Sequence, residues 1–161
     1  MPQSNPANTQ AESFKALVKS LREAIHGPEQ FTLSYGAESS AFVRFNHGKV
    51  RQAGQVQQVS IGLKLINEGR HADLEITLSG DTQVDQQRLA EGLQQLRETL
   101  PLLPQDPYLL LNHNGWQSNN VQAHPLPDTE QVVEQICTAA EGLDLVGFYA
   151  AGPISRGFAS S

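Results

Sequence analysis

Between residues 40 and 78 the side chains alternate between apolar and polar with a period of two. Such alternation turns one side of an extended chain toward a core and the other toward water, which is typical of β-strands. The apolar positions of its three limbs are Ala41, Val43, Phe45, Val59, Ile61, Leu63, Leu65, Ala72, Leu74, Ile76 and Leu78. The limbs are joined at residues 46–48 and 67–69, and both joints end in glycine, which accepts a positive φ without a Cβ clash. The pattern therefore predicts an antiparallel meander with one face that needs a cover.

Helical spacings of three and four between apolar residues flank this meander. The expected helices are residues 14–25, a second helix with Thr82 as its N-cap, and a third that begins at Asp128 or Thr129. The expected strands outside the meander are residues 31–35, 145–151 and 155–161. The predicted fold is thus α+β, with an antiparallel sheet of about five strands covered by helices. Its element order is α-β-β-β-β-α-loop-α-β-β.

Two details of this prediction can be checked residue by residue. Near residues 54–58 the alternation changes phase, because Val56 and Val59 are three positions apart, and we expect a bulge or bend there. The third helix is expected to turn its apolar residues inward, namely Val132, Val133, Ile136, Ala139, Ala140 and Leu143.

The chain of 161 residues suits one main domain. We expect a disordered tail at residues 1–10, an N-terminal α+β domain at 11–152, and the start of a connection to a missing C-terminal domain at 153–161. The final residues begin an extended segment that simply stops, which indicates a fragment. Residues 101–127 form a long, irregular, proline- and asparagine-rich loop, and loops of this length are often functional.

The net charge of -6 lies entirely in residues 101–150, which hold six carboxylates and no Lys or Arg. This balance argues against nucleic acid as a partner, since such a partner requires clustered cations. The single cysteine, Cys137, excludes an internal disulfide and fits a reducing compartment. No apolar run is long enough for a membrane helix, and the N-terminus does not have the pattern of a signal peptide. We therefore expect a cytoplasmic location and no membrane partner.

The sequence offers no catalytic constellation and no metal site. None of the five histidines is followed by Glu, so a zinc helix of the HExxH type is absent. His113 and His124 share a loop, but two surface histidines explain them better than a ligand pair. Cys137 lies on an apolar helix face and is expected to be buried and inert. Residues 152–157 approach a nucleophile elbow, but Pro153 occupies a required glycine position.

The cations Arg44, Lys49 and Arg51 flank the first hairpin turn. One interpretation is a solvated outer sheet face. The other is a patch for an acidic or carboxylate-bearing partner, because arginine presents a rigid fork that matches a carboxylate. Arg44 is the best candidate, since Phe42 and Asn46 share its face. Under this second interpretation the substrate-contacting residues would be Arg44, Asn46 and, near the C-terminus, Arg156.

Several segments in this order resemble the N-terminal part of the TldD/PmbA family, the zinc-dependent peptidases and homologues also called modulators of DNA gyrase. The segments are SAFVRFNHGKVRQ (40–52), Gly69-Arg70, LSGD (78–81), LR (96–97), LPQDPYL (103–109) and DLVGFYAAGPISRGFASS (144–161). No single segment is catalytic, so the specificity of the resemblance lies in their order and spacing.

The resemblance implies a non-catalytic domain that shapes substrate access. Family peptidases hold zinc in a C-terminal domain, through a His-Glu-x-x-x-His helix and a later cysteine. This sequence has no His-Glu pair, and Cys137 comes too early, so no cofactor is expected in this chain. The implied partners are the missing C-terminal domain, a second family subunit in a homo- or heterodimer, and a peptide substrate. The alternative from another class is a free-standing small binding module with no peptidase attached.

Overall fold

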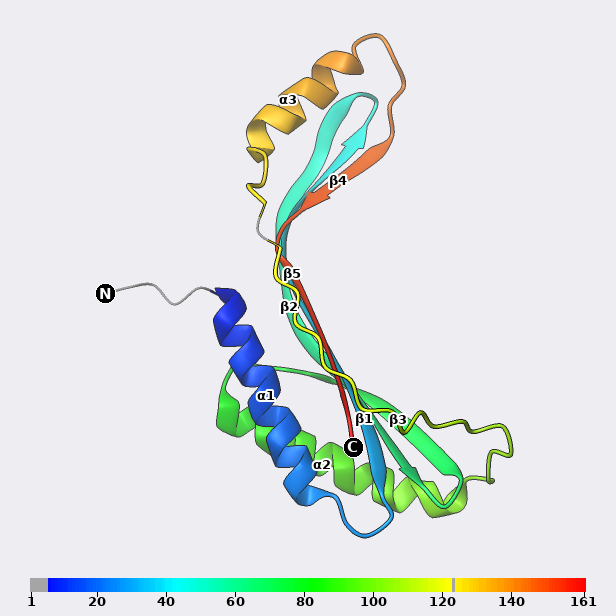
Figure 1. Ribbon diagram of the computed structural model, residues 1–161. Coiled ribbons are helices and arrows are strands. Elements are labelled where there is room, and N and C mark those ends of the chain that lie inside the picture. The colour runs from blue at the N-terminus through cyan, green and yellow to red at the C-terminus, as the bar shows by residue number, and fades with distance from the viewer. Residues whose placement is uncertain (1–5, 123) are drawn as a thin grey trace. The chain divides into compact units, whose positions relative to one another are not determined.

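A computed structural model describes residues 6–122 and 124–161 of the chain. The elements are α1 (Pro6–Ala24), β1 (Gln30–Asn46), β2 (Lys49–Asn67), β3 (Arg70–Thr77), α2 (Thr82–Thr99), the 3-10 helix η1 (Leu100–Leu102), α3 (Thr129–Ala139), β4 (Gly147–Ala151) and β5 (Ile154–Ser160) (Figure 1). The predicted α+β class is confirmed. Of the predicted tail, residues 1–5 lie outside the described residues, and α1 already begins at Pro6.

The five strands form one sheet in the order β3-β2-β1-β4, and β5 also pairs with β1. The strand predicted at residues 155–161 is confirmed as β5. The two strands predicted at 31–35 and 41–46 are one strand, β1. They join because Ala37 and Ser40 are both buried, so the intervening residues stay extended instead of forming a turn.

Two tight turns connect the first three strands, as the glycine positions predicted. His47 and Gly48 have φ values of 51° and 67°, and Glu68 and Gly69 have 50° and 72°. Left-handed backbone at both central residues matches the right-handed twist of a hairpin. β2 continues as one strand through residues 54–58, where a bulge or bend is expected. Val56 and Val59 on either side of the change of phase are both half-buried.

The chain forms two compact units, and both β1 and β2 contribute to each of them. The first unit contains the described residues up to Ala37, together with Gln58–Leu111 and Ile154–Ser161. The second contains Glu38–Gln57 and Asn112–Pro153.

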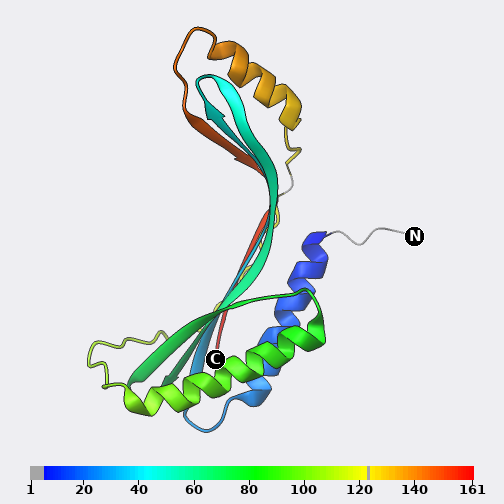
Figure 2. The ribbon, with the colours of Figure 1, turned by 180° about the vertical axis from the view of Figure 1, so that it is seen from behind.

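In the first unit, α1 and α2 lie together on one face of the sheet (Figures 1 and 2). Leu33, Ile61 and Leu63 on the strands are 0% exposed beneath these helices. The helices contribute Leu17, Val18, Leu21, Leu89, Leu93, Leu96 and Leu100 to the same core. Burial of one full side chain of this kind contributes about 1.5–3 kcal/mol. The apolar face of the sheet and the apolar stripes of the helices therefore bury each other.

The start of α2 differs from the prediction by one residue. Asp81 is the N-cap, and its side chain accepts hydrogen bonds from the backbone N–H groups of Gln83 and Val84. Asp85 is 5% exposed and folds back toward the end of the sheet. Its carboxylate accepts from the N–H groups of Ser79 and Gly80 at 2.7 and 3.0 Å. Asp81, and not Thr82, is the N-cap because its carboxylate can accept two N–H donors at the positive end of the helix.

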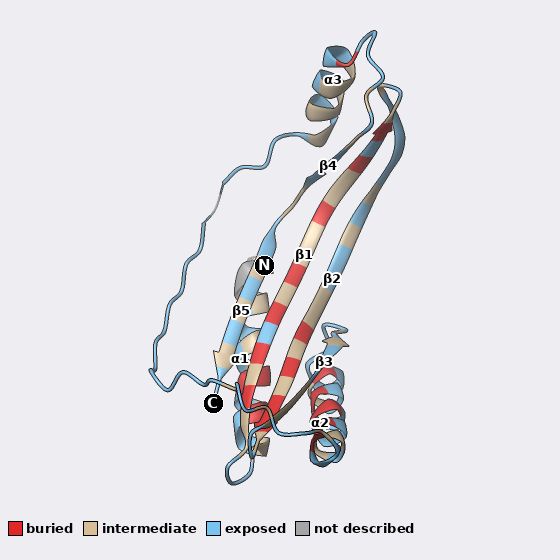
Figure 3. Cartoon of the chain, turned by 90° about the vertical axis from the view of Figure 1, so that its right-hand side faces the viewer, coloured by how far each residue is buried: buried red, intermediate tan, exposed pale blue. Residues whose placement is uncertain are grey.

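In the second unit, β4 pairs with β1, and α3 begins at Thr129, one of the two predicted starts, with Asp128 as its N-cap. Val132, Val133 and Ile136 are half-buried, as the helical pattern indicated. The prediction was wrong for Ala139 and Leu143, since Ala139 is exposed and Leu143 is 66% exposed. Leu143 lies beyond the end of the helix, so its spacing no longer places it on the helical stripe. Figure 3 shows buried and less buried positions alternating along β1.

Candidate functional site

The outer face of the second unit carries a stacked pair of aromatic rings. Phe42 on β1 and Phe148 on β4 have ring centroids 5.9 Å apart, at an interplanar angle of 19°. The antiparallel register places Arg44 directly opposite Phe148 and Phe42 opposite Ala150. Directly opposed residues share one sheet face, so Arg44 and both rings lie on the same side. Sequence reasoning placed Arg44 beside Phe42 but missed Phe148.

Gly54 on β2 makes room for the Phe42 ring. A Cβ atom at position 54 would lie 2.8 Å from Cε1 of Phe42 and 2.9 Å from its Cζ. Those distances are shorter than any ordinary carbon–carbon contact, so the ring occupies space that only glycine leaves open. The ring therefore lies between Gly54 on β2 and the Phe148 ring on β4.

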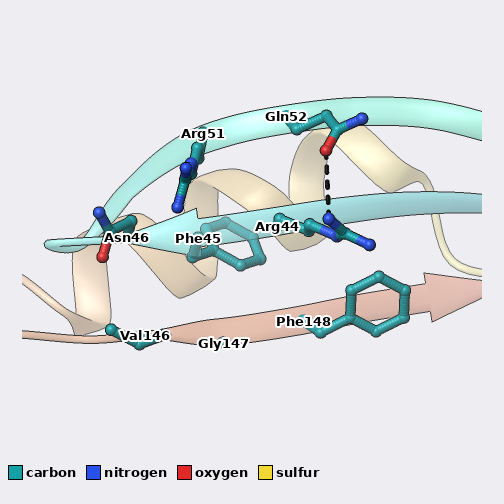
Figure 4. A pocket seen from close by; sticks show the side chains of 8 residues that line it. All are labelled: Arg44, Phe45, Asn46, Arg51, Gln52, Val146, Gly147 and Phe148. Atoms are coloured by element: carbon teal, nitrogen blue, oxygen red, sulfur yellow. Dashed lines mark hydrogen bonds between the residues drawn. The ribbon is translucent and has the colours of Figure 1, made fainter.

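Two contacts hold the Arg44 guanidinium beside the stacked rings. Its Cζ atom lies 5.9 Å from the centroid of the Phe42 ring, within the range of a cation–π contact. Its Nη1 donates a hydrogen bond to Oε1 of Gln52 at 3.5 Å. Figure 4 shows the side chain between Gln52 on β2 and Phe148 on β4. The remaining guanidinium donors are exposed to solvent.

A groove of about 490 Å³ opens beside this arginine. The residues that line it are Arg44, Phe45, Asn46, Arg51, Gln52, Val146, Gly147 and Phe148. Two of its side chains are cationic, and none is anionic. Within the part of the chain that the structure describes, neither Arg44 nor Arg51 has a carboxylate in ion-pair range. The groove therefore combines a positive charge with an apolar wall.

The three residues predicted to contact a substrate do not all meet. Arg44 and Asn46 line the same groove. Arg156 lies on β5 in the first unit, where its Nη1 atom covers Gly36 on β1. A Cβ at position 36 would be 2.7 Å from that nitrogen, so the guanidinium lies close against the strand.

The histidines are dispersed. His47 Nδ1 is 2.6 Å from Oδ1 of Asp144, and His71 Nε2 is 3.2 Å from Oδ2 of Asp106. His113 and His124 are exposed. Over residues 6–122 and 124–161, no three His, Cys, Asp or Glu side chains gather closely enough to hold a metal ion. Cys137 is half-buried, whereas a buried thiol was predicted.

The helices are too short or too polar for a bilayer. In the described ranges, none has the length and apolar content needed to cross a membrane.

Comparisons with known proteins identify the fold. No family model and no curated protein matches the sequence. Among solved structures, TldE from Thermococcus kodakarensis matches 92% of this chain with a TM-score of 0.59 and 11% identity. A modulator of DNA gyrase from Thermotoga maritima matches 94% of it with a TM-score of 0.56 and 9% identity. The chain spans only 37% and 35% of those two proteins. It therefore has the fold of one part of the TldE and gyrase-modulator structures, as the resemblance to the TldD/PmbA family predicted.

Proposed function

We propose that this chain is the non-catalytic N-terminal domain of a TldD/PmbA-like zinc-dependent peptidase. The observation that carries this proposal is the coverage: more than nine-tenths of the chain matches about a third of TldE and of the gyrase modulator. A domain of this kind would act by shaping the access of a peptide substrate and by contacting other subunits. Cytoplasmic location and a homo- or heterodimer belong to the same proposal.

The described residues of this chain do not fit a zinc ion. Tetrahedral zinc sites in proteins take three or four closely placed nitrogen, sulfur or oxygen ligands. The described residues bring no three such side chains together, and the two histidines with carboxylate partners are in separate compact units. Zinc and the hydrolytic step are therefore proposed for a further domain, and none of the residues described above is assigned a catalytic role.

A second candidate is a small binding module without a peptidase. The groove beside Arg44 favours it, because an arginine without a carboxylate partner in the described residues, next to stacked rings, can bind a ligand without other domains. Both candidates predict the same behaviour for the isolated chain, namely no hydrolysis. They differ in what the complete reading frame encodes.

The test compares the 161-residue chain with the protein made from the complete reading frame. The proposal expects stoichiometric zinc and chelator-sensitive peptide hydrolysis in the longer protein, and neither in the chain alone. A complete reading frame without a His-Glu-x-x-x-His helix would favour the binding module. Chelator-sensitive hydrolysis by the 161-residue chain would overturn both.

A further inference from the structure

The groove beside Arg44 has features of a preformed binding site. The Phe42 and Phe148 rings are already stacked, and Gly54 leaves the space that fixes Phe42 in place. A ligand would not have to order these side chains, which lowers the entropic cost of binding. Phe148 and Val146 are 62% and 71% exposed, so the apolar wall is accessible.

The charges of the groove select for an anion. Arg44 keeps free donors after its single hydrogen bond to Gln52, and Arg51 lines the same groove without a carboxylate partner in the described residues. A guanidinium offers two parallel N–H groups to a carboxylate. Asn46 adds an amide that can donate to, or accept from, a peptide group.

We propose that this groove binds a peptide segment in which a carboxylate side chain lies next to an apolar or aromatic residue. The carboxylate would take the free donors of Arg44, and the apolar neighbour would pack on Phe148 and Val146. The choice of a peptide as ligand rests on the proposed function, whereas the pairing of a carboxylate with an apolar group follows from the groove itself. Nucleic acid is disfavoured because the chain carries a net charge of -6.

The experiment measures binding of two N-acetylated, C-amidated hexapeptides to the 161-residue chain by titration calorimetry. One is Gly-Phe-Glu-Glu-Phe-Gly, and the other has both Glu residues replaced by Gln. The proposal expects the Glu peptide to bind at least about tenfold more tightly, which corresponds to about 1.4 kcal/mol, a usual strength for a charge-assisted hydrogen bond. The preference should shrink as salt is added.

Three variants locate the site. Arg44→Gln should remove the preference for the Glu peptide, and Phe148→Ala should weaken both peptides because it removes the apolar wall. Both side chains are exposed, so neither change is expected to unfold the chain. Arg156→Gln is the matched control, because it removes an arginine of the first unit and should leave binding unchanged.

Equal affinity for the two peptides, no measurable binding of either, or full binding by Arg44→Gln would each overturn the inference. Tighter binding of a single-stranded oligonucleotide than of the Glu peptide would also overturn it. Failure of this inference can be told apart from failure of the proposed function: a longer protein that hydrolyses peptides, together with a chain that does not bind the Glu peptide, would refute only the groove.

Discussion

Arg97 on α2 donates two hydrogen bonds to the carboxylate of Glu29, from Nε to Oε1 at 2.8 Å and from Nη2 to Oε2 at 2.7 Å. Nη2 also donates to the carbonyl oxygen of Ala24, the last residue of α1, at 2.6 Å. The side chains of Arg97 and Glu29 are 24% and 12% exposed. One guanidinium therefore links the end of α1, the residue before β1 and the last turn of α2.

The first prediction is that Glu29→Gln lowers the free energy of unfolding by about 1.5–3 kcal/mol at neutral pH, the range for hydrogen bonds to charged groups. The hydrogen bonds from Arg97 hold the pKa of Glu29 below its usual value of 4.5. The folded state thus favours the charged carboxylate, and its contribution is present above the unfolded pKa and lost as the pH falls through the folded one. Urea unfolding at several pH values should show a steeper acid loss in wild type than in the variant. Equal slopes would contradict the prediction.

The second prediction concerns the buried carboxylate of Asp85. Asp85→Ala leaves the N–H groups of Ser79 and Gly80 without their acceptor. Hydrogen bonds to a charged group contribute about 1.5–3 kcal/mol, so the variant should lose about 2 kcal/mol or more. Asp73→Ala is the control, because Asp73 is exposed and its ion pair with Lys64 is long, at 4.0 Å. This variant should change the free energy of unfolding by less than about 0.5 kcal/mol. Similar urea midpoints for the two variants would rule this explanation out.

The third prediction concerns the segment that follows η1. The backbone N–H of Asp106 donates to the carbonyl of Gly69 at 2.7 Å, and its side chain accepts from the N–H of Tyr108 at 2.9 Å. That N–H, and then His71, lower the pKa of Asp106. The segment should therefore stay docked above the usual aspartate pKa of 3.8 and loosen as the pH falls through the lowered folded value.

Hydrogen exchange measures this directly at neutral pH. Asp106→Ala should speed amide exchange at residues 106, 108 and 109, because the variant cannot accept from Tyr108 or contact His71, while Leu63 in the core remains protected. Unchanged exchange at these amides would show that the carboxylate does not hold the segment.

The fourth prediction is that Gly152 cannot be replaced by alanine. A Cβ at this position would lie 2.1 Å from the carbonyl oxygen of Ser39 and 2.5 Å from the Cα of Ser40. Both atoms belong to the backbone of β1, so no side-chain rotation relieves the overlap. Gly152→Ala should lower the free energy of unfolding by about 2 kcal/mol or more. Gly115→Ala, with nothing within 4 Å, should be close to neutral, and a thermal melt that does not separate the two variants would contradict the assignment.

Local sequence patterns predicted the features that depend only on residues close together in the chain. The glycines of the two hairpin turns adopt the positive φ values that their positions required, and Asp128 caps its helix. The failures lie where two local preferences compete, as between Asp81 and Thr82 at the start of α2. The sequence prediction also ended one strand at residue 35 and began the next at 41, whereas β1 runs through, and Ala37 is buried like Leu33 and Tyr35 before it.

The groove also contains some placements that follow from the sequence and others that depend on the tertiary structure. The sequence determined that Phe42, Arg44 and Asn46 share a face, because alternation along one strand fixes that by itself. Only the tertiary structure decided that Phe148, more than a hundred residues later in the chain, stands opposite Arg44. Pairing between distant strands depends on how their faces are buried together, and several registers satisfy one alternating pattern. Arg156 illustrates the same point. It has the residue type of Arg44, but it lies on β5, where its guanidinium lies against Gly36.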